Sequence, residues 1–215
     1  EAEGVERGTK IVLQLKESEQ EFSLKETVER IIKKYSNFVT YPIYLNGQRV
    51  TTLEAIWLKN PKAVTQEEHK QFYKYLTHSV SDPLYTIHFF TDLPLNIHGL
   101  FYIPESHVER YGMSKTEPGV NVYCKKVLIQ AKHREILPEW LRFTKGCVDS
   151  EDLPLHISRE HIQNSPLIRR LNTILTRKIL RFFEDMLHQD RAKYTKFFSE
   201  FGQFFKEGVA SDIMY

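Results

Sequence analysis

This chain of 215 residues has few cysteines, no long apolar run and no signal-peptide pattern. It has only two cysteines, Cys124 and Cys147, which gives neither a disulfide framework nor a metal-ligand spacing and fits a reducing compartment. No apolar run approaches the ~20 residues that span a bilayer, and the opening EAEGVERGTK has no apolar core of a signal peptide. We therefore expect no membrane partner. The abrupt start and end lead us to expect a piece of a longer protein.

A strong charge of either sign is also missing. Lys and Arg number 30 against 28 Asp and Glu, so the formal net charge is only +2 and gives no reason to expect nucleic acid as a partner. One basic run, RKILR, places Arg177, Lys178 and Arg181 on one helix face opposite an apolar stripe. We favour a solvated face, because nucleic-acid binding would want aromatic residues interleaved with those cations.

Common catalytic and nucleotide-binding motifs are absent. There is no P-loop, no other glycine-rich loop, no GxSxG and no HExxH, so a nucleotide used by this chain would be held mostly elsewhere. His156 and His161 lie five apart without a third ligand, and we favour solvated or hydrogen-bonded histidines and no metal site. Cys124 falls inside a strand pattern, which favours a small core residue over a nucleophile.

The first three quarters of the chain mix strand and helix patterns. Asn46-Gly47 lies between two strand-like runs and predicts a two-residue hairpin. Ser23 with Glu26, and Thr65 with Glu68, form the pattern of capping boxes that open helices. Further strands are predicted by alternation or β-branched content at 9–15, 84–90, 97–103 and 119–131.

From Pro166 onward the pattern is helical. Pro166 suits the first helical position after a Ser165 cap, a break is expected near Gln189-Asp190, and Gly208 is the expected helix end. The aromatic series 194–205 favours core packing, although a surface for client proteins through Phe197 or Phe201 remains open. We predict an α/β (α+β) fold, a layered α-β-α sandwich over residues 1–164 followed by a helical coil segment over residues 165–215.

Arg159 stands in DLPLHISREHIQNSP, residues 152–166, where an alternating pattern breaks before the helix. A surface arginine paired with Glu160 is the plainer interpretation. The alternative is chemical: guanidinium is planar, permanently charged and shaped for bidentate contact with phosphate oxygens. Held on a short loop, it could stabilise charge on a transferring phosphoryl group.

At these residues the chain resembles the middle domain of the heat-shock protein 90 chaperone family. The resemblance covers nearly the whole chain, and the motifs that carry it are, in order, RGTKIVLQL, LFYIP, LPEWLRFTKGCVDSEDLPL, SRE..Q and KYTKFFSEFGQFFKEG. The compact YPIYLNGQRVTTLEAIW resembles most the mitochondrial, tumour-necrosis-factor-receptor-associated branch, with bacterial members next. Location in the mitochondrial matrix is therefore expected, or in the cytoplasm for a bacterial member.

The resemblance implies a homodimeric, ATP-driven chaperone that responds to stress and assists protein folding by binding unfolded clients. It implies that Arg159 reaches the ATP γ-phosphate when the domains close and that Gln163 helps organise the closed site. ATP with magnesium would then be bound by the protein's own N-terminal nucleotide domain, and not by this chain alone. A C-terminal dimerisation domain would also lie outside this chain, which implies a monomeric fragment.

Two positions depart from the family pattern. Family members usually have asparagine where this chain has His156, and a client-linked tryptophan of cytosolic members aligns with Val80, so neither role is carried over. The expected function is to couple ATP hydrolysis to client binding, and the fragment alone should not hydrolyse ATP. The alternative is a non-catalytic protein-protein binding module for clients or co-chaperones.

Overall fold

The computed structural model describes residues 7–50, 53–112, 114–153 and 166–211 of the chain. It divides into two compact units, residues 1–52 and residues 53–215. The predicted boundary between residues 164 and 165 lies outside the described residues. Each unit is described by itself below.

The first unit contains two helical segments and one hairpin. They are the 3-10 helix η1 (Glu17–Ser23), α1 (Lys25–Tyr35), β1 (Ile43–Leu45) and β2 (Gln48–Val50). Strands β1 and β2 pair antiparallel, and the turn between them places Asn46 at φ 51° and Gly47 at φ 77°. The hairpin predicted from the Asn-Gly pair is confirmed, because both residues tolerate positive φ.

Two local predictions in this unit are wrong. Residues 9–15 form no strand, and Ile11, Val12 and Leu13 are 76–80% exposed. An alternating pattern alone does not make a strand, because a strand also needs a neighbouring strand with which its main chain can form hydrogen bonds. Ser23 does not cap α1 either: its hydroxyl donates to the Gln20 carbonyl at 2.7 Å, inside the preceding 3-10 turn.

The second unit is built on a five-stranded sheet of order β3-β4-β7-β5-β6. Its strands are β3 (Tyr85–Thr91), β4 (Ile97–Ile103), β5 (Gly119–Cys124), β6 (Val127–Gln130) and β7 (Lys145–Asp149). β5 and β7 run parallel, whereas the other neighbours are antiparallel. Short 3-10 turns η2 (Ile56–Leu58), η3 (Val108–Tyr111) and η4 (Glu139–Leu141) join these elements.

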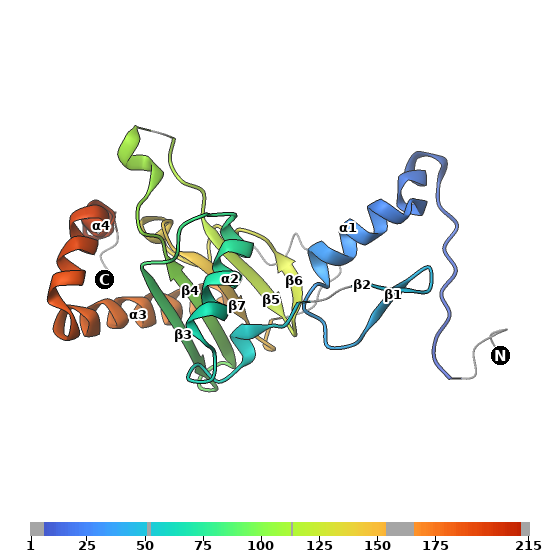
Figure 1. The fold of residues 1–215 in the computed structure, drawn as a ribbon, viewed down its shortest axis with the longest axis horizontal. Helices are drawn as coiled ribbons and strands as arrows, with labels where there is room; N and C mark the ends of the chain where they lie inside the picture. Colours follow the sequence, from blue (N-terminus) through green and yellow to red (C-terminus); the bar gives the residue numbers. More distant parts are fainter. Residues whose placement is uncertain (1–6, 51–52, 113, 154–165, 212–215) are drawn as a thin grey trace. The chain divides into compact units, whose positions relative to one another are not determined.

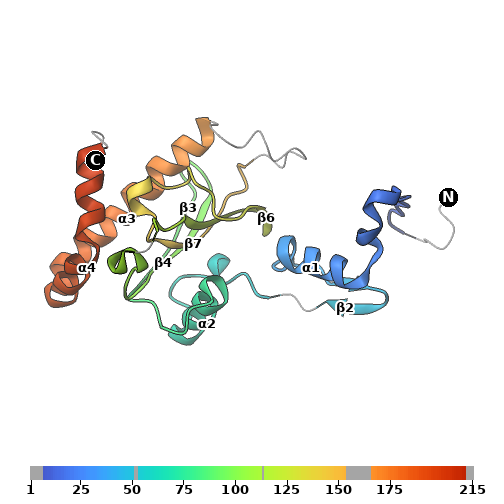
Figure 2. The ribbon, with the colours of Figure 1, turned by 90° about the horizontal axis from the view of Figure 1, so that it is seen from above.

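Helices cover both faces of this sheet. Figure 2 shows α2 (Gln66–Thr77) on one side and α3 (Pro166–Gln189) on the other. Alternate residues explain this: Tyr102 of β4 contacts His69 on α2, while Phe101 belongs to the core cluster shared with α3. The α-β-α layering predicted from the sequence is confirmed, and α2 begins with the predicted Thr65–Glu68 capping box.

Two consecutive helices complete the unit, α3 and α4 (Arg191–Ser211) (Figure 1). The predicted break between them is confirmed at Asp190. Phe197, Phe201 and Phe204 are fully buried in the core cluster, so they pack against the sheet layer instead of facing a client. Gly208 does not end α4; a Cβ there would lie 2.7 Å from the Trp140 ring, so this glycine permits close packing.

One strand and one turn were missed. The predicted strand 119–131 is a hairpin whose turn uses Lys125 and Lys126 at φ 49° and 68°, residues that give no turn signal. The central strand β7 reads as KGCVD, which is short and contains glycine and aspartate. Because β7 is buried between β4 and β5, it shows no alternation of apolar and polar residues.

Candidate functional site

The predicted site residues Arg159 and Gln163, together with His156 and His161, lie in residues 154–165, outside the described residues. The structure does describe where this segment leaves the sheet and where it enters α3. These two flanking regions fix the positions between which the segment must run.

The departure point is fixed by main-chain hydrogen bonds beyond the end of β7. Ser150 N donates to the Tyr123 carbonyl at 3.2 Å, and Leu153 N donates to the Ser150 carbonyl at 3.4 Å. Cys124 Sγ then donates to the Leu153 carbonyl at 3.2 Å, and Leu153 is only 3% exposed. Cys124 is thus a buried core residue, as its position predicted, and it also holds the last described residue before the segment.

A second contact comes from the hairpin between β3 and β4. The exposed carboxylate of Asp152 accepts a hydrogen bond at 2.8 Å from the main-chain N–H of Asn96. The departure point is therefore tied to the tip of a neighbouring hairpin as well as to β5.

A buried carboxylate directly precedes this departure point in the chain. Asp149, the last residue of β7, is 2% exposed, and its Oδ2 accepts from Trp57 Nε1 at 3.1 Å and from Lys126 N at 3.0 Å. Burial raises the pKa of Asp149, and the hydrogen bonds oppose that rise. The Trp57 ring is itself fully buried and lies 4.9 Å from the Tyr123 ring, so the carboxylate joins η2 and the β5–β6 turn to β7.

Replacing Asp149 by alanine is expected to destabilise the fold by about 2–3 kcal/mol, because the hydrogen bonds to a charged acceptor are lost. Because the pKa is raised in the folded state, ionisation of this group costs stability as the pH rises from the ordinary carboxyl pKa through the raised one, so Asp149→Asn, which keeps an acceptor oxygen without charge, should lose less. Urea unfolding measures both, with the exposed Asp185→Ala on α3 as control. Equal losses in Asp149→Ala and Asp185→Ala would contradict this role.

The entry into α3 is fixed by burial. The helix begins at Pro166, as predicted, and Ile168 and Leu171 are 1% and 0% exposed in the core cluster. Asn172 Nδ2 donates to the Glu135 carbonyl at 2.9 Å, which ties the first turns of α3 to the segment before η4. Leu153 before residues 154–165 and Ile168 after them are therefore both buried in the same packed core.

A buried arginine that the sequence patterns did not reveal ties three further elements together. Arg142 is 4% exposed and donates to both carboxylate oxygens of Glu109, from Nε at 2.9 Å and Nη2 at 2.8 Å. It also donates to both oxygens of Glu207 on α4, from Nη1 at 2.6 Å and Nη2 at 3.1 Å, and to the Glu139 carbonyl at 3.2 Å. We call Arg142, Glu109 and Glu207 the arginine clasp. The available signal was an arginine inside the apolar run WLRF.

The clasp predicts an acid-sensitive contribution to stability. The Arg142 guanidinium lowers the pKa of Glu109 to about 2, below its ordinary value of about 4.3. The contribution is therefore complete above pH ~4.3 and is lost as the pH falls towards 2, by about 3 kcal/mol. The free energy of unfolding, measured in urea from pH 2.5 to 7, should show this slope in the wild type and a flatter one in Glu109→Gln. Identical slopes would contradict the assignment.

The basic run on α3 forms a solvated helix face. Arg177, Lys178 and Arg181 are exposed on α3 among Glu184, Asp185 and His188, as a solvated face requires.

Several histidines in the described part are hydrogen-bonded, as favoured from the sequence. Examples are His69 Nδ1 with the Tyr102 hydroxyl at 3.0 Å and His88 Nε2 with the Trp57 carbonyl at 3.2 Å. Across the ranges that the structure describes, no group of three or more His, Cys, Asp or Glu side chains is arranged to hold a metal ion. Nor does that part contain a helix long and apolar enough to cross a membrane.

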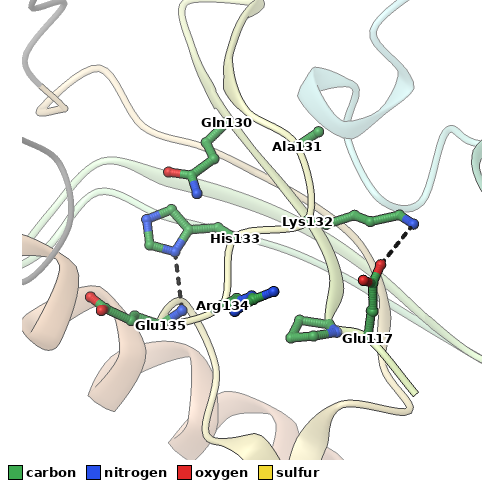
Figure 3. A pocket seen from close by; sticks show the side chains of 8 residues that line it. Glu117, Gln130, Ala131, Lys132, His133, Arg134 and Glu135 are labelled. Carbon is green, nitrogen blue, oxygen red and sulfur yellow. Dashed lines mark hydrogen bonds and ion pairs between the residues drawn. The ribbon is translucent and has the colours of Figure 1, made fainter. Parts of the chain in front are cut away.

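Open cavities lie at the other end of the sheet. One of about 500 Å³ is formed by residues 130–135 together with Glu117 and Pro118. Figure 3 shows Lys132 and Glu117 paired at its edge and His133 accepting from the main chain of Glu135. An adjoining cavity of about 630 Å³ shares Glu117 and Lys132 and is lined also by Lys145, the first residue of β7.

Comparison with known proteins identifies the family. The model of the Hsp90 protein family matches residues 47–215. The chain is 53% identical over all 215 residues to the "TNF receptor-associated protein 1 homolog, mitochondrial" of Dictyostelium discoideum, of which it covers 30%. It is 46% identical over 209 residues, or 97% of its length, to "Chaperone protein HtpG" of Desulfitobacterium hafniense, covering 34% of that protein.

A third relative is "Heat shock protein 75 kDa, mitochondrial" of Rattus norvegicus, 44% identical over 212 residues, which are 98% of this chain and 30% of the relative. The chain thus spans about a third of the length of the curated relatives it matches. The resemblance inferred from the sequence motifs, including the likeness to the mitochondrial branch, is confirmed. The chain belongs to the Hsp90 family.

Proposed function

We propose that this chain is the middle segment of an ATP-dependent molecular chaperone and couples ATP hydrolysis to the binding of client proteins. The observation that carries the proposal is the pair of supports around residues 154–165. Leu153 is held by a hydrogen bond from Cys124, and Ile168 is buried in the core, so the described residues on both sides of the Arg159 segment are fixed.

In this proposal Arg159 contacts the γ-phosphate of ATP when the domains close, and Gln163 organises the closed site. ATP with magnesium is held by the protein's own N-terminal nucleotide domain. Arginine suits the task because its planar guanidinium is always charged and makes bidentate contacts to phosphate oxygens. It would act where negative charge is distributed in the transition state, and the supports reduce the cost of placing it there.

The same proposal covers oligomeric state, domain organisation and location in the cell. The full-length protein is a homodimer whose nucleotide and dimerisation domains lie outside this chain, and the chain itself is a monomer. Residues 1–164 serve as the layered part and residues 165–215 as the helical coil part of the middle domain. Two relatives whose names include "mitochondrial" support a mitochondrial location, which we propose is the matrix, whereas a bacterial origin would place the protein in the cytoplasm.

The test is whether this chain raises ATP turnover by the nucleotide domain encoded upstream of it. By itself the chain should show no turnover. We expect stimulation that saturates with the concentration of the chain and depends on Arg159. Failure to stimulate at any concentration would favour the second function described next.

A second candidate function is a non-catalytic module that binds clients or co-chaperones. Exposed apolar side chains favour it: Val80 after α2 is 93% exposed, and Leu93 and Phe90 at the β3–β4 hairpin are 80% and 50% exposed. Because Phe197 and Phe201 are buried, these residues replace them as the candidate contacts. Binding that survives Arg159→Ala and is lost in Val80→Ser or Leu93→Ser would support this function.

A further inference from the structure

The lysine at the start of β7 has an unusual setting that the proposed function does not use. Lys145 lines the cavity of about 630 Å³ together with Leu76, Val108, Lys115, Glu117, Ala131 and Lys132, among others. Its Nζ donates to the Glu117 carbonyl at 3.2 Å. Among the described residues no carboxylate lies within ion-pair distance of this amine, so a neutral acceptor is what holds it.

A glycine makes room for this side chain. Gly119 and Lys145 face each other in the parallel pairing of β5 with β7. A Cβ on Gly119 would collide with Cδ of Lys145 and lie 2.9 Å from Nζ. The lysine therefore lies across the strand backbone at Gly119, partly buried, instead of extending into solvent.

The charges around the amine favour its neutral form. Burial is the largest cause and the nearby Lys132 is the second, and together they lower the pKa of Lys145 to about 8 against weaker opposition from Glu109 and Glu117. Lys115 and His78 also line the cavity, whereas Glu117 directs its carboxylate to Lys132 at 3.4 Å (Figure 3). At pH 7.5 about a quarter of such amines are unprotonated, against about one in a thousand for an ordinary lysine.

We propose that Lys145 is a nucleophilic amine that is acylated by acyl thioesters entering this cavity. The neutral Nζ attacks the thioester carbonyl carbon, the C–N bond forms and the C–S bond breaks. The nitrogen loses one proton, and the departing thiolate takes up one to become a thiol, without any redox change. Leu76, Val108 and Ala131 provide apolar walls for the acyl chain, which favours this class over a small inorganic anion.

The product is favoured by the same features that activate the amine. A neutral amide replaces a partly desolvated ammonium group, and the repulsion with Lys132 disappears. The reaction requires neither ATP nor Arg159, so it stands independently of the proposed function.

The test is site-resolved acetylation of the full chain. The protein is incubated with the acetyl thioester of N-acetylcysteamine at pH 7.5, and mass spectrometry follows acetylation of Lys145 and of the exposed Lys62 in the same sample. We expect Lys145 to react about tenfold faster, because its larger neutral fraction outweighs the lower nucleophilicity of a weaker base. Its rate should also rise with pH to half of its maximum near pH 8. A Lys145 rate equal to or below that of Lys62 would overturn the proposal.

The matched variant is Gly119→Ala, which leaves Lys145 in the sequence but pushes its flexible side chain towards solvent. Its Lys145 rate should fall to that of Lys62, while circular dichroism reports that the fold is kept. An unchanged Lys145 rate in the folded variant would show that the cavity does not activate the amine. The wild-type pH profile needs no variant, and half-maximal acetylation above pH 10 would overturn the proposal by itself.

Discussion

Under the proposed function, Arg159→Ala should abolish any stimulation of ATP turnover when this chain is added to the nucleotide domain of the full-length protein. An arginine that stabilises a transferring phosphoryl group contributes 10³- to 10⁵-fold in many NTPases, or ~4–7 kcal/mol. We expect a loss at the lower end of that range or below it, because domain closure and not chemistry limits turnover when large segments must dock. Steady-state phosphate release, measured against the concentration of the chain, gives both the maximal stimulation and the concentration for half of it.

Two control variants separate chemistry from docking. Arg177→Ala removes an exposed cation of α3 and should stimulate as the wild type does. Arg159→Lys keeps the charge but loses the bidentate geometry. Its maximal turnover should therefore stay as low as that of Arg159→Ala, while the concentration of the chain that gives half of the stimulation should stay close to the wild-type value. Stimulation by Arg159→Ala equal to that of the wild type would contradict the proposed role of this residue.

Arg142→Met should destabilise the second unit by about 3–5 kcal/mol, a large part of the 5–15 kcal/mol that holds a typical domain folded. Removing the guanidinium leaves the carboxylate of Glu109, 12% exposed, without its bidentate partner. Glu207 contributes less, because its side chain is 47% exposed and solvent screens it. The Phe204 ring, 4.5 Å from the guanidinium carbon, loses a cation–π contact as well.

The charge left behind, and not the lost volume, is expected to dominate that cost. Adding Glu109→Gln to Arg142→Met should therefore recover part of the stability, since no buried carboxylate is then left unpaired. Arg177→Met, an exposed control, should stay within about 0.5 kcal/mol of the wild type. Urea unfolding measures all of these variants. A double variant less stable than Arg142→Met would contradict the claim that the unpaired Glu109 carboxylate causes most of the loss.

The parts of the fold that followed from the sequence are those with strong local signals. The Asn46-Gly47 turn depends on two residues that tolerate positive φ, and the Thr65–Glu68 capping box on hydrogen bonds at the start of α2. In both cases the short motif is enough to predict the local structure. Strands β3 and β4 also followed, because their residues alternate between the two helix layers. Residues 9–15 show where local patterns fail, since alternation predicted a strand that has no pairing in the structure.

What was missed depends on contacts far apart in the chain. Strand β7 is a strand because β4 and β5 flank it, and the Lys125–Lys126 turn is stabilised partly by the Asp149 carboxylate on β7. The arginine clasp joins residues separated by 33 and 65 positions, which no local pattern encodes. For the site itself, Arg159 and Gln163 came from family resemblance, whereas their supports at Leu153 and Ile168 emerged only from packing.

The most direct measurement is the structure of the full-length protein closed around a non-hydrolysable ATP analogue with magnesium. We expect the Arg159 guanidinium nitrogens to lie about 2.7–3.2 Å from γ-phosphate oxygens, on a segment that leaves the sheet at Leu153 and enters α3 at Pro166. A closed, nucleotide-bound structure in which that guanidinium is instead paired within its own domain, away from the phosphate, would contradict the proposal.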